Sequence, residues 1–156
     1  MTDCYSRLRA VRLKTLRPEM LCLIPAGIGA PGSAPRDALT IRVRHEPNYV
    51  LAAVAGEIDI ATVARLRARL WALAASGRTL VADLEQVSFI DASGLGALVG
   101  LAGLAAEHGA SLYVVCAREK IRRPFRLTGL DRTIPLACTL AEVLQILAAS
   151  PQGRVS

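Results

Sequence analysis

Val-Ala-Asp-Leu-Glu-Gln-Val-Ser-Phe-Ile-Asp-Ala-Ser-Gly-Leu-Gly, from Val81 to Gly96, is the most informative stretch of the chain for its architecture. Together with the two residues before it, the apolar run Thr79 to Leu84 predicts a short buried strand. After a short loop, a glycine-rich helix is expected to begin near Ala92 or Ser93 and to end at Gly109. A buried strand that leads through a loop into a helix is the unit from which parallel sheets are built.

The rest of the chain supplies similar units on both sides of this stretch. Alternating apolar and polar residues predict strands, and apolar residues spaced three and four apart predict helices. A Thr-x-x-Glu capping box predicts the start of the last helix. The remaining expected elements are strands 39–44, 49–55, 112–116 and 134–137, and helices from Val63 to Gly77, from Arg118 to Leu127 and from Thr139 to Ser150.

These elements predict an α/β fold with the order β-β-α-β-α-β-α-β-α. Strands that alternate with helices form a mainly parallel sheet through right-handed crossovers, with the helices packed against it. The turn His45 to Asn48 joins the first two strands, so they should form a hairpin that adds an antiparallel edge strand.

The charge of the chain is concentrated at its amino-terminal end. The 156 residues carry 19 Lys and Arg against 13 Asp and Glu, a net charge of +6. Residues 1–36 hold six basic and two acidic residues, a net charge of +4, and their proline- and glycine-rich end predicts a flexible basic leader. Translation starting at Met20 or later is an alternative. We expect one domain over 37–150 and a short tail over 151–156, and the near-neutral charge of that domain argues against nucleic-acid binding.

The motifs of common enzymes and cofactor sites are missing. There is no phosphate-binding GxxxxGK[ST] loop and no GxSxG elbow. The four cysteines show no CxxC spacing, and the two histidines lie far apart, so we expect no metal, no cofactor and no catalysis. The longest apolar stretch, Gly94 to Ala106, is 13 residues, whereas a bilayer span needs about 18. A cytoplasmic chain without membrane insertion is expected.

The start of the glycine-rich helix places a carboxylate and a hydroxyl beside free backbone N–H groups. Asp91 or Ser93 there would be an ordinary N-cap. A phosphate on a serine could use the same N–H groups, but Asp91 would repel it, as would Asp59 if the two loops converge at one sheet edge. The helix also contains four glycines, each costing about 1 kcal/mol relative to alanine. Close packing on the sheet is one explanation, and a smooth face for a partner is the other.

Three segments of the sequence resemble the STAS domain of bacterial anti-sigma-factor antagonists. Gly56 to Thr62 is similar to the G-E-[IL]-D loop of that family. Val81 to Gly96 is similar to its D-L-x-x-V-x-[FY]-[IM]-D-S-[ST]-G-L-G string, and Leu127 to Asp131 is the third segment. In this order the three segments span about residues 39–149. Their combination is specific for the family, whereas any one of them alone would be a weak indication. By this resemblance the domain over 37–150 is a STAS domain.

The resemblance implies a function by protein–protein interaction. Such an antagonist binds an anti-sigma factor that is also a serine kinase of histidine-kinase-like ATPase fold, and thereby frees a sigma factor for transcription. The kinase phosphorylates a serine at the start of the second helix, which breaks the complex, and a PP2C-type phosphatase reverses this. The resemblance assigns partner binding to Glu57, Asp59, Thr62, Asp91, Ala92, Ser93, Gly94, Leu95 and Gly96.

One position departs from the family pattern. The residue after the aspartate, where the family carries its modified serine, is Ala92, and Ser93 is the neighbouring hydroxyl. Ser93 is therefore the candidate phosphoacceptor, or it is a helix cap and the protein is not switched in this way. Other functions stay open: an accessory STAS subunit of an ABC-type lipid or solute transporter, and a nucleotide binder. The basic residues 118–126 predict a solvated helix face or a partner contact.

Overall fold

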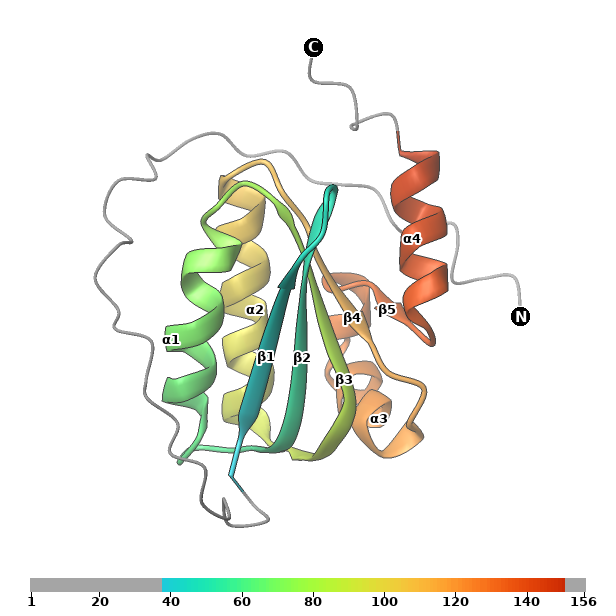
Figure 1. Cartoon of the computed structure of the whole chain (residues 1–156). Helices are drawn as coiled ribbons and strands as arrows, with labels where there is room; N and C mark the ends of the chain where they lie inside the picture. The colour runs from blue at the N-terminus through green and yellow to red at the C-terminus, as the bar shows by residue number, and fades with distance from the viewer. Residues whose placement is uncertain (1–37, 151–156) are drawn as a thin grey trace.

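A mixed five-stranded sheet forms the centre of the fold (Figure 1). The computed structural model describes residues 38–150; the predicted leader and tail lie outside these residues. The sheet consists of β1 (Thr40–His45), β2 (Tyr49–Ile58), β3 (Thr79–Ile90), β4 (Leu112–Val115) and β5 (Leu136–Ala137). The strands lie side by side in sequence order, β1 antiparallel to β2 and all other pairs parallel. The predicted α/β class and the edge hairpin are confirmed.

Helices cover both faces of the sheet (Figure 1). On one face, α1 (Val63–Ala74) lies beside α2 (Ala92–Glu107), and their leucines enter the larger apolar core. On the other face, α4 (Leu140–Ala149) packs Val143 against Val81 and Tyr113 in a smaller core. The helix α3 (Glu119–Thr128) contacts β3 and is followed by the short η2 (Leu130–Arg132). Burial of apolar residues on both sheet faces is the main force that holds these layers together.

The two central strands are longer than the sequence pattern predicts. The pattern ends these strands at residues 55 and 84, but β2 continues to Ile58 and β3 to Ile90. The predicted end of the strand at Leu84, with a loop from there to the helix, is therefore wrong. The strands pair in parallel out to this end, with register shifts near Ala55 and Gly56, so that backbone hydrogen bonding extends both strands although their apolar alternation is broken.

Gly56 occupies one of these register shifts in a conformation that favours glycine. Its φ angle is +106°, and a Cβ atom there would lie 2.8 Å from the carbonyl oxygen of Ala38. A side chain at this position would thus combine backbone strain with a steric clash. This geometry explains the glycine of the G-E-I-D segment, which lies in β2 before the strand ends at Ile58.

The last part of the sheet and its helix differ in detail from the prediction. The strand expected over 134–137 forms only at its end, as β5, while Ile134 is fully buried outside the strand. The capping box is confirmed at Thr139, whose Oγ1 accepts a hydrogen bond from the N–H of Glu142 over 3.3 Å. The carboxylate of Glu142 in turn accepts from the N–H of Cys138, 2.8 Å away. Across residues 38–150, no helix is long and apolar enough to cross a membrane.

Candidate functional site

Two loops meet where the parallel strands β2 and β3 end. Ile58 and Ile90 are paired at this edge of the sheet. The N–H of Asp91, the next residue after β3, donates to the carbonyl oxygen of Ile58 over 3.0 Å. The segment that follows β2 is therefore held against the amino-terminal end of α2, and the two acidic loops converge at one sheet edge. We call this edge the helix mouth, comprising residues 57–62 and 91–96.

Asp91 is the N-cap of α2. Its Oδ1 accepts a hydrogen bond from the N–H of Gly94 at 3.0 Å and from the hydroxyl of Ser93 at 2.5 Å. The Ser93 hydroxyl, followed by the Gly94 N–H, lowers the pKa of Asp91, and the N–H of Ile60 contributes in the same direction. The carboxylate is thus kept charged at the positive end of the helix dipole. Ser93 serves the cap as a donor rather than forming the cap itself.

The loop after β2 is shaped by Asp59 and Thr62. The Oδ1 of Asp59 accepts from the N–H groups of Ala61 and Thr62 at 2.9 and 3.0 Å. The hydroxyl of Thr62 lies 2.8 Å from the carbonyl oxygen of Glu57 and donates to it. These bonds fix a tight turn before α1. The side chain of Ile60 at its tip is left 77% exposed.

The nine predicted site residues differ in how much surface they present. All nine lie in the helix mouth, but Gly94 and Leu95 are buried beneath it. The side chains of Asp59 and Thr62 form hydrogen bonds within their own loop. Ala92 and Gly96 are exposed on α2, and Ser93 is half-buried with its hydroxyl turned to Asp91. The surface that the start of α2 offers to a partner is therefore made of small residues.

The sequence pattern did not predict the exposed large apolar side chains in and beside the helix mouth. Ile60, Phe89 and Leu127 are exposed, Phe89 by 43% and Leu127 by 75%. Phe89 and Leu127 also line a groove of about 530 Å³ between the end of β3 and α3. No pattern in the sequence marks Phe89 as exposed. Ser88 and Phe89 are consecutive exposed residues of β3, so the inward and outward alternation of the strand breaks there, and only the folded structure shows this break.

The glycines of α2 do not share one explanation. A Cβ at Gly94 would lie 2.6 Å from Cγ2 of Ile58 and 2.8 Å from Cγ1 of Ile90, so close packing explains this glycine. At Gly96 and Gly103 a Cβ would meet nothing within 4 Å, and at Gly100 it would only touch the ring of Trp71 at 3.8 Å. Within residues 38–150, packing on the sheet therefore leaves the exposed glycines of α2 unexplained.

The comparisons with known proteins agree with this fold. A family model described as the STAS domain matches residues 40–143. The anti-sigma-F factor antagonist RsfB of Mycobacterium tuberculosis is 36% identical over 115 residues, which cover 72% of this chain and 91% of that protein. The anti-sigma-B factor antagonist of Bacillus subtilis is 33% identical over 99 residues, covering 64% and 91%.

A solved structure supports the same assignment. The crystal structure of an anti-sigma factor antagonist from Mycobacterium paratuberculosis matches with a TM-score of 0.67 and 34% identity, over 74% of this chain and 98% of that one. The fold and the sequence together define a STAS domain, and the chain belongs to the STAS-domain family. Within that family it is similar to proteins named anti-sigma factor antagonists.

Proposed function

We propose that this protein is an anti-sigma-factor antagonist that works by binding and not by catalysis. Its similarity to named antagonists supports this. The observation that carries the proposal is the exposed surface of Ala92 and Gly96 on the first turns of α2, beside the ordered Asp59 loop. A partner that approaches there meets helix backbone without large intervening side chains.

The exposed glycines of α2 support the same surface. Glycine in a helix interior costs about 1 kcal/mol relative to alanine. Gly96 and Gly103 gain no intramolecular packing in return within residues 38–150, because a Cβ at either position would meet nothing. Close approach of another protein gives these glycines a role. The proposed partner is a kinase-type anti-sigma factor, whose capture would free a sigma factor in the cytoplasm.

Ser93 is the phosphoacceptor in this proposal. Its hydroxyl lies 2.5 Å from Oδ1 of Asp91 and donates to it. A phosphate on this oxygen would carry a charge of about −1.5 to −2 and would replace a hydrogen-bond donor by an anion facing the carboxylate. The repulsion would disrupt the cap and change the charge of the helix mouth, and the complex would separate. A PP2C-type phosphatase would restore the original surface.

Binding is tested by calorimetry against each kinase-type anti-sigma factor encoded in the source genome. We expect the unmodified chain to bind one of them. The Gly96→Ala variant should bind about 10-fold or more weakly, since a methyl group would stand in the contact. The matched control within the same helix is Glu107→Ala, at the far end of α2. Failure of the wild-type chain to bind any of them would contradict the proposal; permease and ATPase genes beside this gene would then favour the transporter subunit.

Phosphorylation is tested separately, by incubation with the bound kinase and ATP and measurement of the intact mass. We expect one phosphate on the wild-type chain and none on Ser93→Ala. Ser76→Ala supplies a matched control, because it removes an exposed hydroxyl beyond the far end of α1 and should keep the phosphate. A phosphate that persists on Ser93→Ala would reject Ser93 as the acceptor, and an unmodified wild-type chain would reject the switch while leaving the binding proposal intact.

A further inference from the structure

The groove between the end of β3 and α3 has an apolar floor and a basic rim. Its volume is about 530 Å³, and its lining includes Phe89, Ile121 and Leu127. Ile121 is buried, whereas Leu127 is 75% exposed. Removal of this exposed apolar surface from water would favour binding. The rim carries the basic side chains of Lys120 and Arg123 and the carboxylate of Glu119, which is paired with Arg126.

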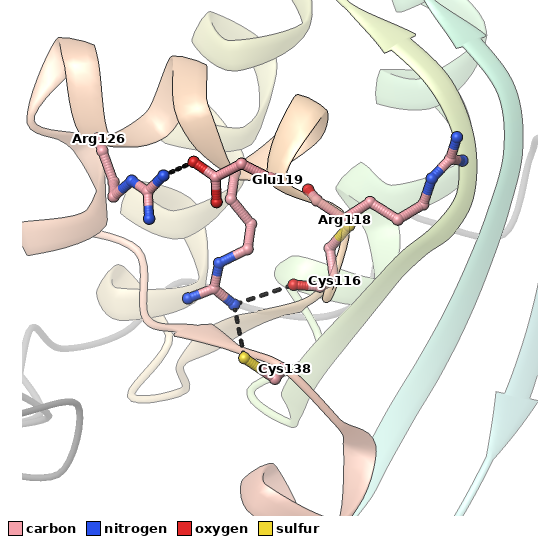
Figure 2. A network of polar contacts seen from close by, with 6 residues as sticks. Cys116, Arg118, Glu119, Arg126 and Cys138 are labelled. Carbon is pink, nitrogen blue, oxygen red and sulfur yellow. Dashed lines mark hydrogen bonds and ion pairs between the residues drawn. The ribbon is translucent and has the colours of Figure 1, made fainter. Parts of the chain in front are cut away.

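Three of the five basic side chains between residues 118 and 126 form hydrogen bonds or an ion pair with other residues of the domain. Nη1 of Arg118 donates to the carbonyl oxygens of Glu85 and Val87, at 3.2 and 2.8 Å. Figure 2 shows the ion pair between Arg126 and Glu119 and marks the bonds that reach Cys116 and Cys138. Nη1 of Arg122 contacts the carbonyl oxygen of Cys116 at 2.9 Å and Sγ of Cys138 at 3.1 Å, and Arg126 forms an ion pair with Glu119.

The two basic side chains that remain, Lys120 and Arg123, are those that line the groove. Neither forms an ion pair within residues 38–150. They are three residues apart on α3, so they project from the same face of the helix. Two cations beside an apolar floor, without counter-ions, form a surface complementary to a carboxylate-bearing segment with a large apolar side chain.

Neither residues 1–36 nor residues 151–156 of this chain carry the net negative charge that would complement Lys120 and Arg123. Residues 1–36 have a net charge of +4, and residues 151–156 carry Arg154 without an acidic residue. Two residues of the groove lining, Phe89 and Ile90, directly precede Asp91 of the helix mouth in the sequence. The groove therefore lies next along the chain to the proposed binding surface.

We propose that the groove binds an acidic segment of the anti-sigma factor, in which a large apolar side chain occupies the floor and flanking carboxylates pair with Lys120 and Arg123. This inference rests on the proposed antagonist function and extends its contact surface from α2 to α3. The floor residues supply affinity, and the two cations select the partner by charge.

The test measures binding of the same anti-sigma factor by calorimetry. The double variant Lys120→Glu, Arg123→Glu should bind about 10-fold or more weakly, because attraction becomes repulsion. Leu127→Ala should weaken binding about 5-fold or more through the loss of apolar contact. The matched control, Arg42→Glu with Arg67→Glu, makes the same change of net charge at exposed positions on β1 and α1, and should stay within about 2-fold of wild type.

Each outcome supports or overturns the inference. Circular dichroism tests whether each variant folds. If the charge-reversal variant does not fold, Lys120→Gln, Arg123→Gln replaces it. Weakening in the groove variants and not in the control supports the inference. If the groove variants bind with wild-type affinity while Gly96→Ala binds weakly, the groove is not part of the contact surface. The proposed antagonist function is then still supported. If the wild-type chain binds no anti-sigma factor, both proposals fail.

Discussion

Gly94 lies so close to Ile58 that a Cβ atom on it would stand 2.6 Å from Cγ2 and 3.1 Å from the carbonyl oxygen of that residue. This contact joins the first turn of α2 to the end of β2. The same carbonyl oxygen accepts the N–H of Asp91 over 3.0 Å. The backbone of the helix thus lies directly against the side chain and the carbonyl oxygen of Ile58, and the helix mouth has its shape because residue 94 has no side chain.

Gly94→Ala and Gly96→Ala should change stability in opposite directions. At position 94 the methyl group would overpack a buried contact, and we expect a loss of about 1–3 kcal/mol in the free energy of unfolding. At position 96 it would meet nothing, and the gain in helix propensity should add about 0.5–1 kcal/mol. Urea unfolding of both variants measures this. A stabilised Gly94→Ala variant would contradict the close contact.

Ser93→Ala should raise the pKa of Asp91 toward its ordinary value. The Ser93 hydroxyl is the main cause of the lowered pKa, and the Gly94 N–H would remain. Carbon-detected NMR titration of the Asp91 carboxyl measures the change. An unchanged pKa would show that the hydroxyl does not donate to the carboxylate in solution.

The same bond predicts an acid dependence of stability. Because the pKa of Asp91 is lower in the folded chain, the charged cap stabilises the fold at a pH above the ordinary pKa of aspartate. This stabilisation is lost as the pH falls through the lowered, folded value. Ser93→Ala should therefore unfold with a weaker acid dependence than wild type, as measured by urea unfolding across acidic pH. Ser88→Ala, which changes an exposed serine on β3, serves as the control and should keep the wild-type dependence.

Cys138 should react with iodoacetamide faster than Cys116 at neutral pH. Cys138 is exposed, whereas Cys116 is 1% exposed and burial raises its pKa, which lowers its thiolate fraction. Peptide mapping by mass spectrometry separates these sites from Cys4 and Cys22. In concentrated urea the difference between the two thiols should disappear. Faster labelling of Cys116 in the folded chain would contradict its burial.

Thr139→Ala should lower the stability by about 1 kcal/mol. The hydroxyl oxygen of Thr139 accepts the N–H of Glu142 at the start of α4, and alanine leaves this helix donor without its cap. Thermal unfolding measures the effect. Thr139→Ser keeps the hydroxyl and should retain most of the stability, so equal losses in both variants would argue against a capping role.

Much of the fold could be predicted from local patterns. The helix boundaries near Val63, Ala92 and Thr139 follow from apolar spacing and capping residues, which act within a few residues of the chain. The ends of β2 and β3 could not be predicted in this way. They depend on pairing between strands about 30 residues apart, and their register shifts interrupt the alternation that marks a strand.

Motifs and local periodicity were enough to predict the family, the order of elements and the two acidic loops of the helix mouth. Which mouth residues reach the surface became known only from the packed fold. There Ser93 turns toward Asp91 and Leu95 is buried, while Phe89, just outside the mouth, is exposed. The packed fold also leaves Lys120 and Arg123 without an ion-pair partner among residues 38–150. The physical reason is that exposure and pairing depend on what other segments cover, and the sequence pattern of one segment does not contain that information.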